Sequence, residues 1–222
     1  MSNEFNSIEQ AQATNGTGLG NGTVSIQTHG CKLNQADSEE LARRFVEAGY
    51  KVVGPSDPAD VYVLNTCTVT HTADSKARQS LRAAYRLTPS SLIVATGCYA
   101  QRAPEDVARV NGVGMVVGNS QKRHLVEMVL GARGDQLVAC AVGEDTSTLP
   151  IAQGIGRTRA MVAIQEGCNQ VCAYCIVPKV RGRERSISPA LLLRHVKRSV
   201  QEGYKEVVLT GTQLGSYGFD LE

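Results

Sequence analysis

Residues 60–67 read DVYVLNTC, an apolar run of strand length that ends on a cysteine. Similar runs, rich in Val, Ile or Leu, occur at TVSIQT (23–28), SLIVAT (91–96) and VGMVV (113–117). Between them lie segments with apolar residues at helical spacing, at 35–48, 73–87 and 120–130. Fully apolar strands that alternate with helices are typical of parallel sheets covered on both faces. The sequence therefore predicts an α/β fold with a doubly wound parallel sheet.

Three of the four runs are followed within three residues by a cysteine, namely Cys31, Cys67 and Cys98. Because the carboxyl ends of parallel strands meet at one edge of a sheet, we expect these three thiols to converge on one crevice. Their separations along the chain, 36 and 31 residues, are each about one strand–helix–strand repeat. Gly30 and Gly97 directly precede two of the cysteines and would let the backbone approach a bulky ligand closely.

Two other interpretations of this trio stay open at the level of sequence. Cysteines near strand ends are often simply buried small hydrophobes. Alternatively, three thiols and one imidazole form a common tetrahedral zinc site, and His29 or His71 could supply the fourth ligand.

A second trio lies in the stretch GCNQVCAYC (167–175), which holds Cys168, Cys172 and Cys175 in a CxxxCxxC spacing. The stretch directly follows the apolar run AMVAIQ (160–165), so it forms a loop at a strand end. Three thiolates leave one iron of a four-iron cluster free to bind a substrate or cofactor. Zinc loops share this spacing, but they usually add a second CxxC pair, which this sequence lacks.

The composition is that of an ordinary globular protein, with 222 residues, 42% hydrophobic and 20% charged. We expect a disordered tail over 1–22, a first domain over 23–142, a linker over 143–159 and the incomplete start of a second domain over 160–222. The sequence shows neither a secretory signal nor an apolar run long enough to span a membrane. We therefore expect a cytoplasmic protein, in whose reducing surroundings seven cysteines favour ligands over disulfides.

The cysteine motifs together resemble one family, the radical S-adenosylmethionine (SAM) methylthiotransferases. The second trio, with Tyr174 before its last thiol, resembles the radical SAM signature. THGCKLNQADSE (28–39), NTCTVT (65–70) and ATGCYAQ (95–101) resemble the N-terminal domain of these enzymes. The resemblance covers 24–222, about half of a complete family member, and implies that 160–222 begins a partial (β/α) barrel.

The resemblance implies two 4Fe-4S clusters. Cys168, Cys172 and Cys175 would hold the cluster whose open iron binds SAM, with Tyr174 near the adenine, and an electron from it would cleave SAM to a 5′-deoxyadenosyl radical. The other trio, Cys31, Cys67 and Cys98, would hold an auxiliary cluster that carries the sulfur to be inserted. The implied partners are tRNA and an electron donor such as a flavodoxin or ferredoxin system, with no membrane. The chain by itself is expected to be inactive, because the rest of the barrel is missing.

Within the family, GCKLNQ (30–35) and RGRERS (181–186) resemble the branch that methylthiolates N6-threonylcarbamoyladenosine beside the tRNA anticodon. Lys179 departs from the aromatic residue that tRNA-modifying members often carry after the preceding proline. Branches that act on isopentenyladenosine or on a ribosomal-protein aspartate are alternatives. From another class, a zinc-stabilised RNA-binding module without catalysis also fits.

Basic residues gather downstream of the second trio. Between 179 and 198 there are seven Lys or Arg and one Glu. Four of them alternate along the chain, so in an extended loop they would point to one side and could contact RNA phosphates: Lys179, Arg181, Arg183 and Arg185. A solvated surface is the plainer interpretation.

Overall fold

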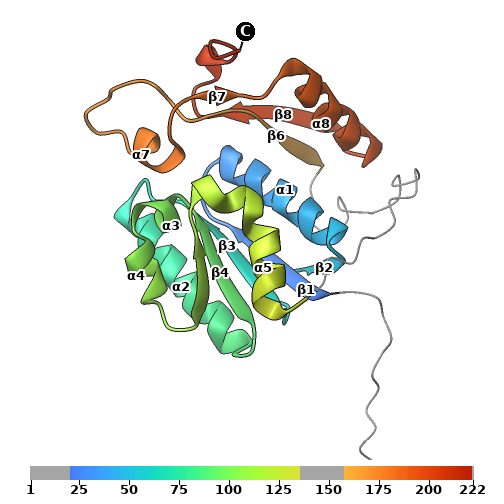
Figure 1. Cartoon of the computed structure of the whole chain (residues 1–222), viewed down its shortest axis with the longest axis vertical. Helices are drawn as coiled ribbons and strands as arrows, with labels where there is room; N and C mark the ends of the chain where they lie inside the picture. Colours follow the sequence, from blue (N-terminus) through green and yellow to red (C-terminus); the bar gives the residue numbers. More distant parts are fainter. Residues whose placement is uncertain (1–20, 136–157, 222) are drawn as a thin grey trace, which may run out of the picture.

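The computed structural model describes residues 21–135 and 158–221, which form two α/β units (Figure 1). The expected tail and most of the expected linker lie outside the described residues. At their edges both expectations need correction, because Gly22 already belongs to the first strand and Arg159 begins the first strand of the second unit. Within the described residues, no helix is long and apolar enough to cross a bilayer.

The first unit is a five-stranded sheet in which all neighbouring strands are parallel, as the sequence predicts. The strand order is β2-β1-β3-β4-β5. The strands are β1 (Gly22–Thr28), β2 (Tyr50–Val53), β3 (Val61–Thr66), β4 (Leu92–Gly97) and β5 (Val113–Val117). Sequence reasoning missed β2, which is a four-residue edge strand directly after a helix. Such a short run carries little periodicity.

Helices cover both faces of this sheet (Figure 1). One face buries its apolar residues against α1 (Lys32–Glu47) and α5 (Leu125–Arg133), and η1 (Asn119–His124) leads into α5. The other face packs on α2 (His71–Leu87) and on two short helices, α3 (Cys98–Arg102) and α4 (Pro104–Ala108). The last two were not predicted, because five residues are too few to display a helical period.

The second unit is a small sheet of order β7-β6-β8. Its central strand β6 (Arg159–Glu166) pairs parallel to β8 (Glu206–Gly211) and antiparallel to β7 (Arg185–Ser186). Between β7 and β8 runs α8 (Pro189–Gln201), and η2 (Leu214–Ser216) follows β8. The expected long loop over 166–187 is interrupted by α7 (Val177–Arg181) and by β7.

Helix α1 is packed from two sides, because it lies between the two sheets (Figure 1). Leu41 and Phe45 belong to the core of the first unit. The opposite side contacts β6, where the Glu39 carboxylate accepts a hydrogen bond of 3.0 Å from the Met161 backbone N–H. Ion pairs continue this contact toward α8: Arg43 with Glu202 at 3.2 Å, and Glu47 with Arg198 at 2.7 Å.

Near the start of α1, Asp37 is a half-buried carboxylate with two cationic partners. Its Oδ2 lies 2.8 Å from Lys122 and 3.0 Å from Arg181. Burial alone would raise the pKa of Asp37, but the two cations outweigh burial and lower the pKa below its usual value of about 3.8. A depressed pKa stabilises the fold above the pKa of the unfolded chain, and this stabilisation is lost as the pH falls through the folded pKa.

Replacing Asp37 tests that pair of ion contacts. Asp37→Asn should lower the free energy of unfolding at pH 7 by on the order of 3 kcal/mol, because it leaves buried cations without one of their anions. Below about pH 4 the difference from the parent should shrink, because the carboxylate of the unfolded parent is then protonated, and it should vanish only at the lower pH where the folded carboxylate is protonated too. Chemical denaturation across pH 3 to 7 measures both effects. Asp106→Asn is the matched control, because Asp106 forms an exposed pair with Arg109. This substitution should change the free energy of unfolding by no more than about 0.5 kcal/mol.

Gly97, at the end of β4, has a backbone conformation that only glycine adopts readily, with φ +96° and ψ −163°. A Cβ atom there would lie 2.4 Å from the Thr66 carbonyl oxygen. Gly97→Ala should therefore destabilise the protein by about 3 kcal/mol or more in thermal or chemical unfolding. Gly131 is the control: it lies in α5 with nothing within 4 Å of the added methyl, so Gly131→Ala should stabilise by up to about 1 kcal/mol. Equal effects of the two substitutions would contradict this account.

Candidate metal centres

The structure brings the ends of the three cysteine-bearing strands together at one edge. In the β1–β3 pair Thr28 is opposite Asn65, and in the β3–β4 pair Thr66 is opposite Gly97. Because each cysteine comes within three residues of these positions, the loops that carry Cys31, Cys67 and Cys98 are neighbours. The order β2-β1-β3-β4-β5 reverses direction between β1 and β3, and this switch point is where open α/β sheets bind their ligands.

None of these three thiols is buried. Cys31 is exposed, Cys67 and Cys98 are half-buried, and all three are free. Unpaired cysteine is among the residues most often found fully inside a protein, so accessible thiols at a sheet edge do not fit the interpretation as small core hydrophobes.

Two glycines allow this convergence. A Cβ on Gly30, whose φ is +122°, would lie 2.8 Å from the Cβ of Cys67. A Cβ on Gly97 would meet the backbone of Thr66. The glycines before Cys31 and Cys98 therefore let the neighbouring strand ends approach each other closely.

Polar side chains that follow the cysteines brace this edge, and sequence reasoning missed them. Thr68 donates to Asp74 at 2.8 Å and accepts from Arg102 at 2.7 Å, while Arg102 also pairs with Asp74 at 2.5 Å. Thr68 follows Cys67 and Arg102 lies four residues after Cys98, so this network ties two cysteine loops together. Its signal in the sequence is weak, because Thr and Asp near strand ends are common in turns.

Two asparagines lie beside the thiols themselves. The Cys31 Sγ is 3.5 Å from the Asn34 Oδ1, and the Asn34 amide donates to the backbone carbonyls of His29 and Thr66 at 3.0 and 2.9 Å. Asn119, just beyond the end of β5, places its amide nitrogen 3.8 Å from the Cys98 Sγ. Asn119 could have been found from sequence, since it occupies the end of the fourth strand where the other three strands carry cysteines.

The second trio lies on a loop whose base is closed by backbone contacts. The Cys168 N–H donates to the Gly182 carbonyl at 3.1 Å, and the Cys175 N–H donates to the Cys172 carbonyl at 3.2 Å. Gln165 is almost completely buried and supports this base, because its side-chain amide donates a hydrogen bond of 2.9 Å to the Gly167 carbonyl. Cys172 is exposed, Cys168 and Cys175 are half-buried, and Tyr174 is 93% exposed at the loop tip.

The two trios lie at a shared junction between the units. Helix α7, which follows Cys175, packs against α3, which begins with Cys98. Asn119 links them, because the amide that faces Cys98 also donates to the Val180 carbonyl at 2.7 Å.

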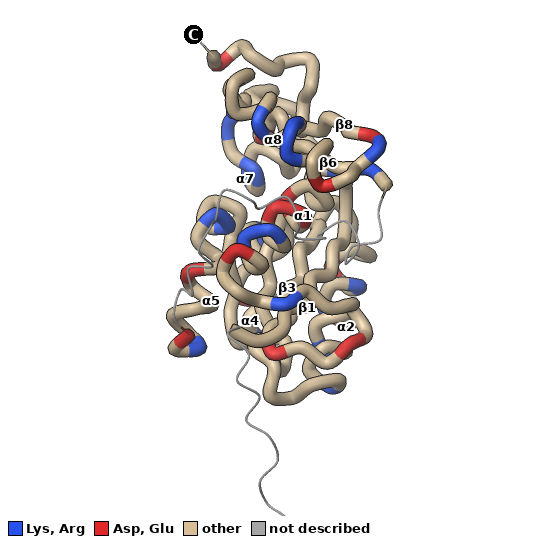
Figure 2. The backbone as a smooth tube through the Cα atoms, turned by 90° about the vertical axis from the view of Figure 1, so that its right-hand side faces the viewer, with Lys and Arg blue, Asp and Glu red and all other residues tan. Residues whose placement is uncertain are grey.

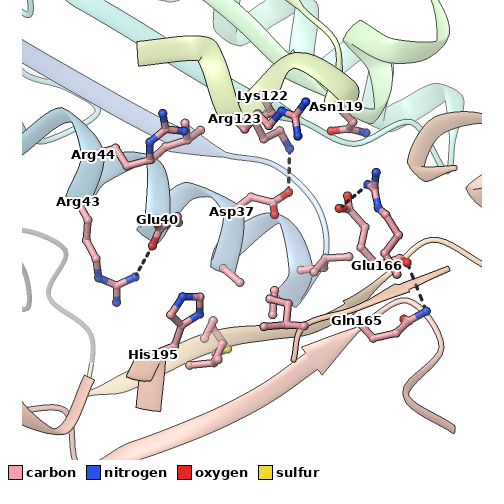
Figure 3. Close-up of a pocket in the computed structure, with 18 of the residues that line it drawn as sticks. Asp37, Glu40, Arg43, Arg44, Asn119, Lys122, Arg123, Gln165, Glu166 and His195 are labelled. Carbon is pink, nitrogen blue, oxygen red and sulfur yellow. Dashed lines mark hydrogen bonds and ion pairs between the residues drawn. The ribbon is translucent and has the colours of Figure 1, made fainter. Parts of the chain in front are cut away.

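Beside this junction is a pocket of about 760 Å³ between α1, η1, β6 and α8 (Figure 3). Asp37, Asn119 and Glu166 line it, and none of the six cysteines does. Its size falls in the range of small-molecule sites.

The four basic residues expected on one side of an extended loop do not form a stripe. Lys179 and Arg181 belong to α7, and the Arg181 side chain is only 3% exposed. Arg185 is exposed but pairs with Glu166 at 3.2 Å, and Arg183 and Lys179 face solvent. Figure 2 shows basic residues on α7 and α8 at the same end of the molecule. The prediction of a one-sided stripe was wrong because the chain turns helical after Cys175.

No three His, Cys, Asp or Glu side chains within 21–135 and 158–221 are arranged as ligands of a single metal ion. His29, the suggested zinc ligand, instead contacts the Ser80 hydroxyl at 3.4 Å, and burial, aided by Lys76, lowers its pKa. His71 is exposed at the start of α2. Three thiols on neighbouring loops can also serve as ligands of an iron–sulfur cluster, which is larger than one ion.

Comparison with known sequences divides the chain as the structure does. Residues 23–118 match the Uncharacterized protein family UPF0004, and residues 162–216 match the Radical SAM superfamily. The first match covers the five-stranded sheet with its cysteine edge, and the second covers the loop with the other trio.

Curated relatives carry both regions. A threonylcarbamoyladenosine tRNA methylthiotransferase of Aquifex aeolicus is 40% identical over 205 residues, which are 89% of this chain and 49% of the relative. The enzyme of the same name from Bacillus subtilis is 39% identical over 208 residues, 90% of this chain and 46% of the relative. A tRNA-2-methylthio-N(6)-dimethylallyladenosine synthase of Moorella thermoacetica is 35% identical over 210 residues, 90% of this chain and 47% of the relative. The chain spans about half the length of these relatives, and it is a homologue of the radical SAM methylthiotransferases.

Proposed function

We propose that this chain is part of a two-cluster radical SAM methylthiotransferase that modifies N6-threonylcarbamoyladenosine in tRNA. The observation that carries the proposal is the pair of accessible cysteine trios, one at the switch-point edge of a parallel sheet and one on a loop after β6, at a shared junction. The substrate follows the printed names of the Aquifex and Bacillus relatives. Because tRNA is the substrate, we expect the enzyme to work in the cytoplasm.

In this proposal each trio holds one 4Fe-4S cluster. Cys168, Cys172 and Cys175 would leave one iron open for SAM, and the other three thiols would hold an auxiliary cluster near the target. When bound, SAM and the clusters would supply the one-electron chemistry and the sulfur that an unactivated carbon requires. A ferredoxin- or flavodoxin-type donor would deliver the electrons.

The residues around the trios have roles that follow from their contacts. Gln165 and the backbone of Gly182 fix the base of the radical loop. Tyr174 is exposed at the loop tip, free to lie against the adenine of SAM. Asn34 and Asn119 orient the strand ends that carry Cys31 and Cys98. The adjacent pocket offers room for a nucleoside or for SAM.

A second substrate has a specific observation in its favour. The Moorella relative, at 35% identity, is named for dimethylallyladenosine, so the isopentenylated nucleoside is the alternative target. Assaying the full-length protein on tRNA that carries one or the other nucleoside separates the two.

Metal content tests the two-cluster proposal directly. After anaerobic reconstitution the chain should hold about eight irons, and the triple variant Cys31→Ala, Cys67→Ala, Cys98→Ala about four. The triple variant Cys168→Ala, Cys172→Ala, Cys175→Ala should also hold about four, with a cluster that no longer responds to SAM in its spectrum. Stoichiometric zinc with little iron would overturn the proposal in favour of a zinc-stabilised RNA-binding module.

Contacts to tRNA are tested by removing exposed cations. Lys179→Gln and Arg183→Gln should each weaken tRNA binding and reduce the slope of log affinity against log salt by about one. Filter binding or fluorescence anisotropy at several salt concentrations measures the slope. Arg109→Gln, an exposed arginine on the first unit with two acidic partners, is the control and should leave the slope unchanged. Identical slopes for all variants would place the tRNA surface elsewhere.

A further inference from the structure

Arg181 is a buried arginine in the junction between the two units. One of its terminal nitrogens lies 3.0 Å from Asp37 and 2.8 Å from Glu166, and the other donates to the Asn34 side-chain oxygen at 2.6 Å. These three partners come from α1 and from the end of β6, so one guanidinium joins the first unit to the second. Only 3% of the side chain is exposed.

The electrostatics of the junction favour a fixed cation there. Burial opposes a charged guanidinium, but the carboxylates of Asp37 and Glu166 outweigh burial and raise the pKa of Arg181. Asp37 also pairs with Lys122, whose ammonium reaches the Asn65 side-chain oxygen at 3.3 Å. Breaking one buried charge contact costs far more than breaking an exposed one.

The three residues that contact Arg181 each lie within six residues of a cysteine in the sequence. Arg181 ends the short helix that follows Cys175, and Glu166 lies two residues before Cys168. Asn34 accepts from Arg181 through the oxygen that also lies beside the Cys31 thiol. The loop of the second trio is thereby held against the strand ends of the first.

We propose that Arg181 is a positioning residue that fixes the two cysteine trios relative to each other and places a permanent positive charge beside the first trio. This inference rests on the proposed function, because it assigns a purpose to the separation of two clusters. A phosphate contact for Arg181 does not suit this geometry, since both of its terminal nitrogens face protein acceptors and almost none of the side chain reaches solvent.

The first test measures docking of the second trio's loop in the metal-free chain. Arg181→Gln should speed hydrogen exchange at the amides of Cys168, Val180 and Gly182 by at least about tenfold. Arg181→Lys keeps the positive charge but loses one of the two nitrogens that contact the partners. It should therefore increase hydrogen exchange less than Arg181→Gln does. Arg183→Gln, two residues away but exposed, is the matched control and should leave these amides as in the parent.

The second test measures how the charge of Arg181 affects the reduction midpoint of a cluster in the first trio. In the Cys168→Ala, Cys172→Ala, Cys175→Ala background only the first trio can hold a cluster, and its reduction midpoint is measured by redox titration. Arg181→Gln should make the midpoint more negative, because a nearby cation stabilises the reduced, more negative cluster. Arg181→Lys should restore the parent midpoint in large part, and Arg183→Gln should leave it unchanged.

The outcomes separate this inference from the proposed function. Unchanged exchange together with an unchanged midpoint in Arg181→Gln would overturn the positioning role. Weaker tRNA binding with a lower salt slope and unchanged exchange would make Arg181 a phosphate contact instead. Loss of iron from every protein, the parent included, would overturn the two-cluster function, while the exchange result would still decide the docking role. Should Arg181→Gln fail to fold, Glu166→Gln removes one partner and should show the same change in exchange to a smaller extent.

Discussion

The structure depends on one helix that is buried from two sides. Apolar residues of α1 complete the core of the five-stranded sheet, while its polar residues face β6 and α8. A helix with one apolar stripe needs only one sheet to bury that stripe. Here Glu39 and Arg43 are buried and Asp37 is half-buried, and each has a partner from the second unit or from η1. The relative placement of the two units is therefore set by hydrogen bonds and charge pairs, which are more demanding of geometry than apolar contact.

This arrangement explains why the chemistry-bearing residues lie where they do. A parallel sheet sends all of its carboxyl ends to one edge, and α1 leaves that edge directly after Cys31. The first turn of α1 therefore lies between the thiols of the first unit and the loop of the second. Asn34 lies in that turn and contacts Cys31 on one side and Arg181 on the other, while Asp37 in the following turn also pairs with Arg181. The fold brings two distant cysteine motifs together without a direct bond between them.

The sequence alone predicted the parallel sheet, its main helices and the shared edge of Cys31, Cys67 and Cys98, because apolar periods and strand-end positions are local patterns. It could not predict β2, α3 or α4, which are too short to show a period. The sequence also could not predict that Arg181 is buried. An alternating run of cations looks solvated until the partners are known, and Asp37 and Asn34 are more than 140 residues away in the chain. Long-range charge pairs leave no mark on the local pattern.

The accessibility of the thiols has a practical side. Cys31 and Cys172 are exposed, and thiols in that position can pair between two molecules as soon as oxygen is present. Protein isolated in air without iron will accumulate covalent dimers and larger species that have nothing to do with its native assembly. A native molecular mass is therefore meaningful only for material kept under nitrogen with reductant. A series of bands on a non-reducing gel shows that the thiols were oxidised during isolation.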